Sequence, residues 1–218
     1  MPDRRRLLQG LSAGSLSLLL STYLRQAVAA GGKPVPPGLY RIDGEVRING
    51  QHARPGQAIG PGDAIHTGPA ASAIYVVGED AFLQRENTRV SLGEGLLKDV
   101  LRLTTGKLLS VFAKGSRRIE TPTATIGIRG TGCYLEAEEK RVYFCLCYGT
   151  ADVSPLAEPG RVETITTRHH DHPVYLHADQ GMPMMAPASV INHSDAELIL
   201  LENLVGRWPP FYGQGERY

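Results

Sequence analysis

Three cysteines, Cys133, Cys145 and Cys147, supply the groups of this chain best suited to soft-metal or thiol chemistry, and they lie in one short stretch. A thiolate is both a nucleophile and a metal ligand. Cys145 and Cys147 are two residues apart on an expected strand, so both side chains point to the same face. The sequence therefore predicts a patch of sulfur atoms on one side of a sheet.

The place of Cys133 depends on the turn of an expected hairpin. Residues 132–137 and 141–148 read as its two arms, with the charged residues 138–140 as the tip. A three-residue tip puts Cys133 opposite Cys145, and all three sulfur atoms then converge. A tip one residue longer or shorter turns Cys133 to the other face of the sheet.

Three interpretations of the cysteines stay open. Cys133 can form a disulfide with either partner and leave one buried thiol, as an oxidising compartment allows. The three thiolates can instead hold a transition metal (Zn, Fe or Cu), with a histidine completing the site. Alternatively, all three are small core residues. A disulfide between Cys145 and Cys147 is disfavoured, because neighbours on one face of an extended strand orient their Cβ atoms poorly for it.

Histidines are the other candidate ligands, and five of the seven are concentrated in one segment: His169, His170, His172, His177 and His193. We take His169, His170 and His172 as the candidates that complete the metal site. Asp171 can orient one imidazole. The competing interpretation is a solvated loop, and His193, just before a helix cap, needs only a packing role.

The methionines of the same segment, Met182, Met184 and Met185, are soft ligands but also common core fillers. Catalysis finds no support, because neither a nucleophile elbow, nor a His-Glu-x-x-His motif, nor a phosphate-binding glycine loop occurs. We therefore predict no catalytic residues and favour a protein that is not an enzyme.

Residues 1–30 have the pattern of a cleaved export signal. Three arginines precede an apolar run over residues 11–24, and Ala27-Val-Ala29 suits a signal peptidase. The arrangement resembles a twin-arginine (Tat) signal, with an ordinary Sec signal as the alternative. We expect a periplasmic protein exported by the Tat route.

Charge and hydropathy limit the partners. The whole chain carries +1; residues 1–30 hold four arginines and one aspartate, +3, so the remainder carries −2. This balance disfavours a nucleic-acid partner, which would need a basic patch. We also expect no stable membrane span after cleavage, since no second apolar run is long enough.

The sequence after the signal predicts a mainly β fold. Residues 31–38 read as a flexible leader, residues 39–155 as a domain of many short strands, and residues 156–218 as a His-rich segment, a helix and an extended tail. Asn49-Gly50 is a strong hairpin signal after a strand over 42–48. A β-sandwich or roll and a short solenoid both fit this pattern. Residues 104–106 are expected to form a turn between two strands, and residues 166–187 to be irregular.

One helix is expected near the C-terminus. Ser194 and Glu197 form a capping-box pattern, an apolar stripe follows, and Gly206 suits the helix end. The stripe predicts packing against an open side of the β domain; its members are Leu198, Leu201, Leu204 and Val205. Trp208 and Phe211 in the tail are expected to pack there too.

Several stretches together resemble a FecR-type domain over about residues 40–155. They are Gly44–Gly50, Pro55-Gly56 with Ile59, Gly62–Gly68, Leu101–Leu109, and Thr121-Pro followed by Gly127-Ile-Arg-Gly-Thr131. The resemblance implies an all-β periplasmic module used in signalling or binding. In the proteins that give the family its name, this domain follows a membrane helix and a cytoplasmic segment that governs a sigma factor; neither is expected here. The cysteines and the C-terminal half are not part of the general family pattern. The sigma-regulating role is therefore not carried over.

These observations predict a non-catalytic FecR-domain protein of the periplasm, a binding or sensing module linked to metal or envelope signalling. Its expected partner is an envelope or membrane protein. The alternative is a metalloprotein whose Cys/His site performs redox or metal-transfer work.

Overall fold

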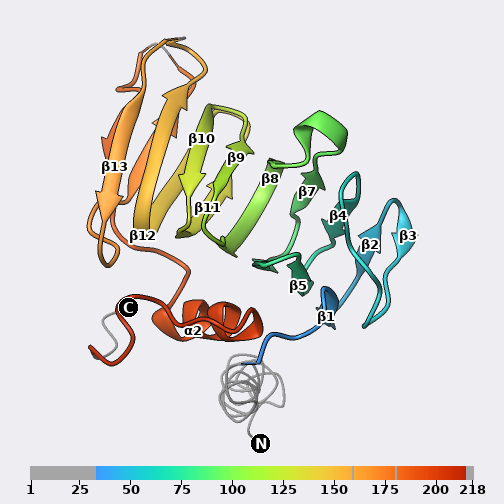
Figure 1. The fold of residues 1–218 in the computed structure, drawn as a ribbon. Coiled ribbons are helices and arrows are strands. Elements are labelled where there is room, and N and C mark those ends of the chain that lie inside the picture. The colour runs from blue at the N-terminus through green and yellow to red at the C-terminus, as the bar shows by residue number, and fades with distance from the viewer. Residues whose placement is uncertain (1–32, 159, 180, 215–218) are drawn as a thin grey trace, which may run out of the picture.

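The computed structural model describes residues 33–158, 160–179 and 181–214, and within them the protein is mainly β with one C-terminal α-helix (Figure 1). The expected export signal lies outside the described residues. No helix in the described ranges is long and apolar enough to cross a membrane. The mainly β prediction, with a single helix at the C-terminal end, is confirmed.

The strands form two sheets that share β8 and β12. Sheet A runs in the order β1 (Gly38–Asp43), β5 (Ser72–Val77), β6 (Asp80–Gln84), β8 (Val100–Val111), β11 (Gly132–Ala137), β12 (Arg141–Pro155), β14 (Val174–His177) and β15 (Met185–Pro187). Sheet B runs in the order β3 (Gln51–His52), β2 (Val46–Ile48), β4 (Ala64–Thr67), β7 (Arg89–Leu92), β8, β9 (Ser116–Glu120), β10 (Ala124–Arg129), β12 and β13 (Glu163–Thr167). A short 3-10 helix, η1 (Gly95–Leu97), precedes β8.

Each shared strand changes sheet at a glycine. Gly106 in β8 has φ +94°, and an added Cβ there would lie 2.2 Å from Thr88 Oγ1. Gly149 in β12 has φ +99° and is crowded by Thr131 in the same way. The turn predicted for residues 104–106 is therefore wrong: the chain bends at Gly106 without leaving the strand, and β8 continues into the second sheet.

Other local predictions can be compared directly with the structure. The Asn49-Gly50 hairpin is confirmed, and both residues have the positive φ that a tight hairpin turn requires. The strand expected over residues 42–48 is two strands, because the chain turns at Gly44, which also has positive φ. The segment 166–187, expected to be irregular, contributes β14, β15 and the end of β13 to the two sheets.

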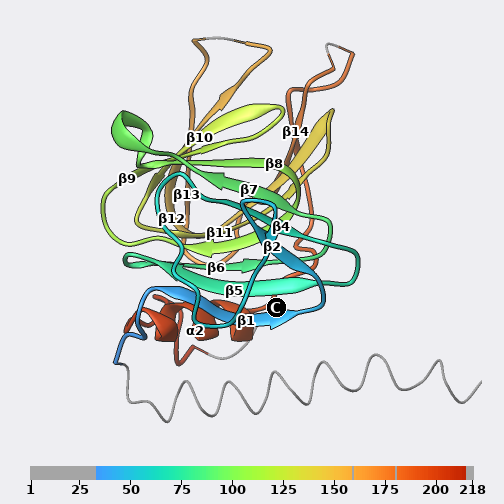
Figure 2. The same cartoon turned by 90° about the vertical axis from the view of Figure 1, so that its right-hand side faces the viewer.

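Two apolar layers result from this arrangement. Sheets A and B enclose one core, to which β11 and β12 contribute Cys133, Leu135, Phe144 and Leu146. The opposite face of sheet A packs against the C-terminal helix, α2 (Asp195–Leu204), and forms a second core. Figure 2 shows the helix on one side of the strands, as Figure 1 does.

The helix has the predicted ends and the predicted buried face. Ser194 and Glu197 form the capping box, with the Ser194 amide donating to Glu197 Oε2 at 3.0 Å. Leu198, Leu201 and Leu204 are buried against sheet A. In the tail, Phe211 is buried as expected, whereas Trp208 is 41% exposed and pairs with Tyr212, so its predicted packing on the β domain is wrong.

Candidate metal centre

Four buried side chains converge between the outer face of sheet A and the start of α2. Cys145 and Cys147 come from β12, His170 from the connection between β13 and β14, and His193 from the residue before the helix cap. One ligand atom of each of the four lies within 4.8 Å of the others. Strand β12 therefore supplies two possible ligands, and the C-terminal part of the chain supplies two.

The strand places both sulfur atoms by simple alternation. Cys145 and Cys147 face α2, while Phe144 and Leu146 face the core between the sheets. Cys133 pairs with Leu146 across the hairpin and therefore faces that inner core as well.

A tight turn places His170. Its backbone has φ +55°, and its amide donates to Cys147 O at 2.9 Å. The carboxylate of Asp171 accepts from the amides of Arg168 and His169 at 2.8 and 3.3 Å, which holds the turn closed. Asp171 was predicted to orient an imidazole. Its carboxylate instead bonds to the backbone amides of this turn.

The two histidines present ring nitrogens to each other. His170 Nδ1 lies 3.0 Å from His193 Nε2 and 3.4 Å from Cys145 Sγ. On the far side of each ring, His193 Nδ1 lies 2.7 Å from Ile191 O, and His170 Nε2 lies 3.1 Å from Asp195 Oδ1. The near nitrogens therefore meet at one point, with a sulfur atom beside them.

The outer partners decide which nitrogens carry protons. A backbone carbonyl only accepts, so His193 Nδ1 must be the N–H of that ring. An ionised carboxylate also only accepts, so His170 Nε2 is an N–H as well. In two neutral rings the facing nitrogens are then both lone pairs 3.0 Å apart, which repel unless a cation or a shared proton lies with them.

The pKa shifts inside the cluster also reflect close contact between the cysteines and the histidines. Hydrogen bonds from Cys147 and from the two histidines lower the pKa of Cys145 well below its usual range, despite burial. Burial and the neighbouring Cys145 raise the pKa of Cys147. Burial opposes the charged form of His170, but Cys145 and Asp195 outweigh it and raise its pKa. These shifts favour negative charge on Cys145 and positive charge near His170.

Aromatic rings close the cluster from water. Tyr134 stacks on His193 with ring centroids 4.7 Å apart, and Phe211 stacks on His169 at 4.2 Å. Both rings are buried. A group bound here would lie in a dry, low-dielectric place, where charge interactions are strong.

The structure brings together only part of the predicted site. Cys133 lies on the opposite face of the sheet, because the hairpin closes on Ala137 and Val142 and the tip is one residue longer than three. The disulfide, one of the three interpretations of the cysteines, is not formed, since all three cysteines are free. Of the candidate histidines, only His170 is in the four-residue cluster.

The other histidines lie elsewhere. His169 is buried behind the cluster, where its Nε2 bonds to Asp195, and His172 is exposed to solvent. Sequence reasoning missed His193, to which it gave only a packing role. The available signal was its place directly before the capping box, which puts it wherever the helix docks. The methionines line a separate surface pocket with Glu158 and Arg161.

Comparisons with known proteins add a distant likeness. No family model matches the chain, and a search of curated proteins found no match. Two crystal structures of a candidate anti-sigma factor from Parabacteroides distasonis are similar, each at 10% sequence identity and a TM-score of 0.47. The likeness covers 58% of this chain and 59% of that chain.

Proposed function

We propose that this protein is a non-catalytic metal-binding β protein that holds one zinc-like divalent ion. The ligands are Cys145 Sγ, Cys147 Sγ, His170 Nδ1 and His193 Nε2. The observation that carries the proposal is the pair of facing imidazole nitrogens, 3.0 Å apart, beside two sulfur atoms in a buried cluster. A cation at that point removes the repulsion between two facing lone pairs.

The donor set favours zinc. Two thiolates and two imidazoles are a common ligand set of structural zinc sites. Two thiolates also neutralise a divalent charge, which a buried site requires. All four ligands come from the protein and all four are buried, so a fourth position open to water or substrate is not expected. This closed arrangement supports a structural or regulatory ion more than redox or metal-transfer work.

The cysteine placement supports the same proposal. Cys145 and Cys147 share one strand face and are poorly oriented for a disulfide with each other, and Cys133 lies behind the sheet. Two thiols that cannot pair with each other suit metal ligation in an oxidising compartment.

The proposal also covers the compartment and the partner of the protein. The pattern of residues 1–30 supports export by the Tat route, which carries folded proteins and so allows an ion to be installed first. The motif from Thr121 to Thr131 supports a FecR-type binding or sensing module. In this view an envelope or membrane protein is the partner, and the ion is held jointly by the cysteines of β12 and by the C-terminal half, neither of which belongs to the general FecR pattern.

Metal analysis of the purified full chain tests the proposal. We expect about one equivalent of zinc per chain after dialysis against a weak chelator. Replacement of that zinc by Co²⁺ should give the absorption of a tetrahedral ion with thiolate ligands.

Matched variants make the test specific. Cys145→Ala, Cys147→Ala and His193→Ala should lose the ion, whereas Cys133→Ala and His172→Ala should keep it, because these two residues lie outside the cluster. Wild-type protein that takes up neither Zn²⁺ nor Co²⁺ would overturn the proposal. Equal loss in Cys133→Ala and Cys147→Ala would overturn the ligand assignment.

A further inference from the structure

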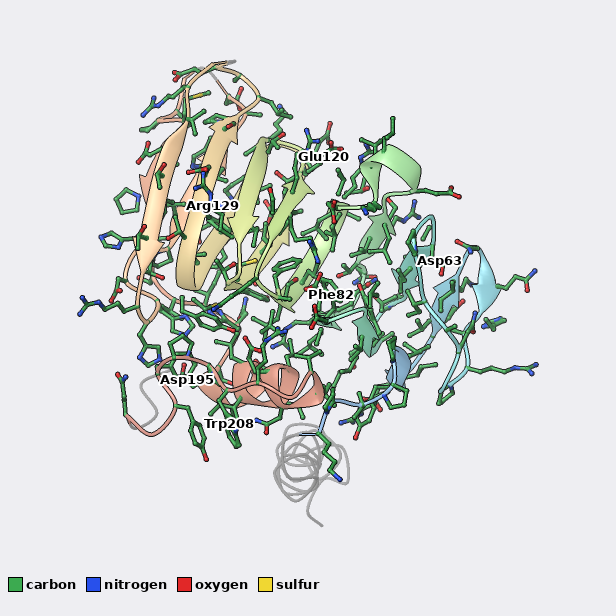
Figure 3. The ribbon with its side chains drawn as sticks, in the orientation of Figure 1. Asp63, Phe82, Glu120, Arg129, Asp195 and Trp208 are labelled. Atoms are coloured by element: carbon green, nitrogen blue, oxygen red, sulfur yellow. The ribbon has the colours of Figure 1, made fainter. Side chains whose placement is uncertain are left out.

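The carboxylate of Asp195 lies directly behind the proposed metal centre. Asp195, labelled in Figure 3, is the first residue of α2. It is 1% exposed. Its Oδ1 lies 3.1 Å from His170 Nε2 and 2.8 Å from His169 Nε2, and its Oδ2 lies 2.9 Å from His169 Nε2. One buried carboxylate therefore accepts from two adjacent histidines.

This contact determines what His170 presents to the cluster. With Nε2 donating to Asp195, the lone pair of His170 is on Nδ1, which faces Cys145 and His193. The same hydrogen bond fixes the rotation of the ring. A carboxylate acceptor also makes an imidazole a stronger ligand, as in the carboxylate–histidine–metal arrangements of known sites.

A role in helix capping alone does not account for Asp195. Acidic residues are favoured in the first turn of a helix. In α2, however, Ser194 and Glu197 already form a capping box, and Asp195 is directed at the histidine rings. The nearly complete burial of a carboxylate is costly and is offset here by imidazole donors.

We propose, on the basis of the metal site proposed above, that Asp195 is the positioning residue of that site. It fixes the tautomer and orientation of His170, and it links the occupied site to the first turn of α2. Asp195 does not contact the ion itself.

The test compares Asp195→Asn with Glu202→Gln in the full chain. Both changes replace a buried carboxylate of α2 by an amide. Glu202, however, bonds to Tyr148 and Arg207 and to none of the proposed metal ligands. Zinc affinity is measured by competition with a chelator. We expect Asp195→Asn to weaken zinc binding by about 10- to 100-fold, the usual effect of removing such a partner. Glu202→Gln should bind zinc nearly as wild type does.

The Co²⁺ spectrum supplies a readout that a purely structural role would not move. Asp195→Asn should keep two thiolate ligands but shift the ligand-field bands, because one imidazole donor is weaker and less constrained. Asp195→Glu, which keeps an acceptor, should recover part of the affinity. If Asp195→Asn does not fold, Asp195→Glu is compared with wild type: its longer side chain displaces the acceptor, so its zinc affinity should fall below that of wild type, and an equal affinity contradicts the inference.

The outcomes separate the two proposals. Equal affinities in Asp195→Asn and wild type would overturn the positioning role and leave the metal site intact. Equal losses in Asp195→Asn and Glu202→Gln would assign the effect to helix docking, which also overturns it. Wild-type protein without any metal affinity would overturn both.

Discussion

Removal of the ion should release the C-terminal helix from sheet A. Two proposed ligands belong to β12 and two to the chain that leads into α2, so the ion connects the two parts. The perturbation is Cys147→Ala, which removes one ligand on the sheet side, or a chelator added to wild-type protein. Both changes leave the apolar face of the helix unaltered.

The magnitude follows from the contacts of the helix. Burial of the apolar side chains of α2 contributes roughly 6–12 kcal/mol, at about 1.5–3 kcal/mol each; these are Leu198, Leu200, Leu201 and Leu204. Ordering the ten residues of α2 costs roughly 10–20 kcal/mol of backbone entropy. The two ranges overlap, so burial alone leaves docking marginal, and an ion at a concentration of about 1,000 times its Kd adds about 4 kcal/mol. Docking should therefore depend on the ion.

Hydrogen–deuterium exchange is the assay. We expect the amides of residues 195–204 to lose protection by about three orders of magnitude when the ion is removed, the equivalent of about 4 kcal/mol. The strands of sheet B should keep their protection. Cys133→Ala is the matched control and should keep both the ion and the protection of α2. Unchanged protection of α2 in protein shown to be metal-free would refute the reasoning.

Two further predictions concern the fold. Gly106→Ala should lower the free energy of unfolding, measured in urea, by about 3 kcal/mol or more, because φ is positive and the new Cβ meets Thr88. Gly56→Ala is the control, since Gly56 has positive φ but open space around it, and should lower that free energy by less. Equal losses in the two variants would show that the contact with Thr88 does not matter. Tyr148→Phe removes the hydroxyl that donates to the buried Glu202 carboxylate, and should cost about 1.5–3 kcal/mol. An unchanged unfolding midpoint in that variant would show that the hydrogen bond contributes nothing.

Local signals in the sequence predicted much of the fold. The Asn49-Gly50 turn and the capping box of Ser194 and Glu197 depend on a few adjacent residues, and both are observed. Chain bends inside a strand are harder to predict. Gly106 looks like a turn residue, but the conformational freedom of glycine is used there to pass a strand between two sheets.

The candidate site was only partly predictable, because it depends on register and on docking. One extra residue in the hairpin tip moves Cys133 to the other face of the sheet, and nothing in the tip sequence fixes that length. His193 joins Cys145 only when α2 packs against sheet A, which is a contact between distant parts of the chain. Spacing along the sequence could suggest His170 and His172 alike, although the turn buries one and exposes the other.

The strands shared by the two sheets bear on how the protein loses its structure. Because β8 and β12 each form backbone hydrogen bonds in both sheets, neither sheet can unfold while the other stays intact. Unfolding of the two sheets, by force or by heat, should then have a single free-energy barrier. Thermal unfolding of the two sheets should accordingly give one sharp calorimetric peak, without a partly unfolded intermediate whose exposed strand edges would promote aggregation.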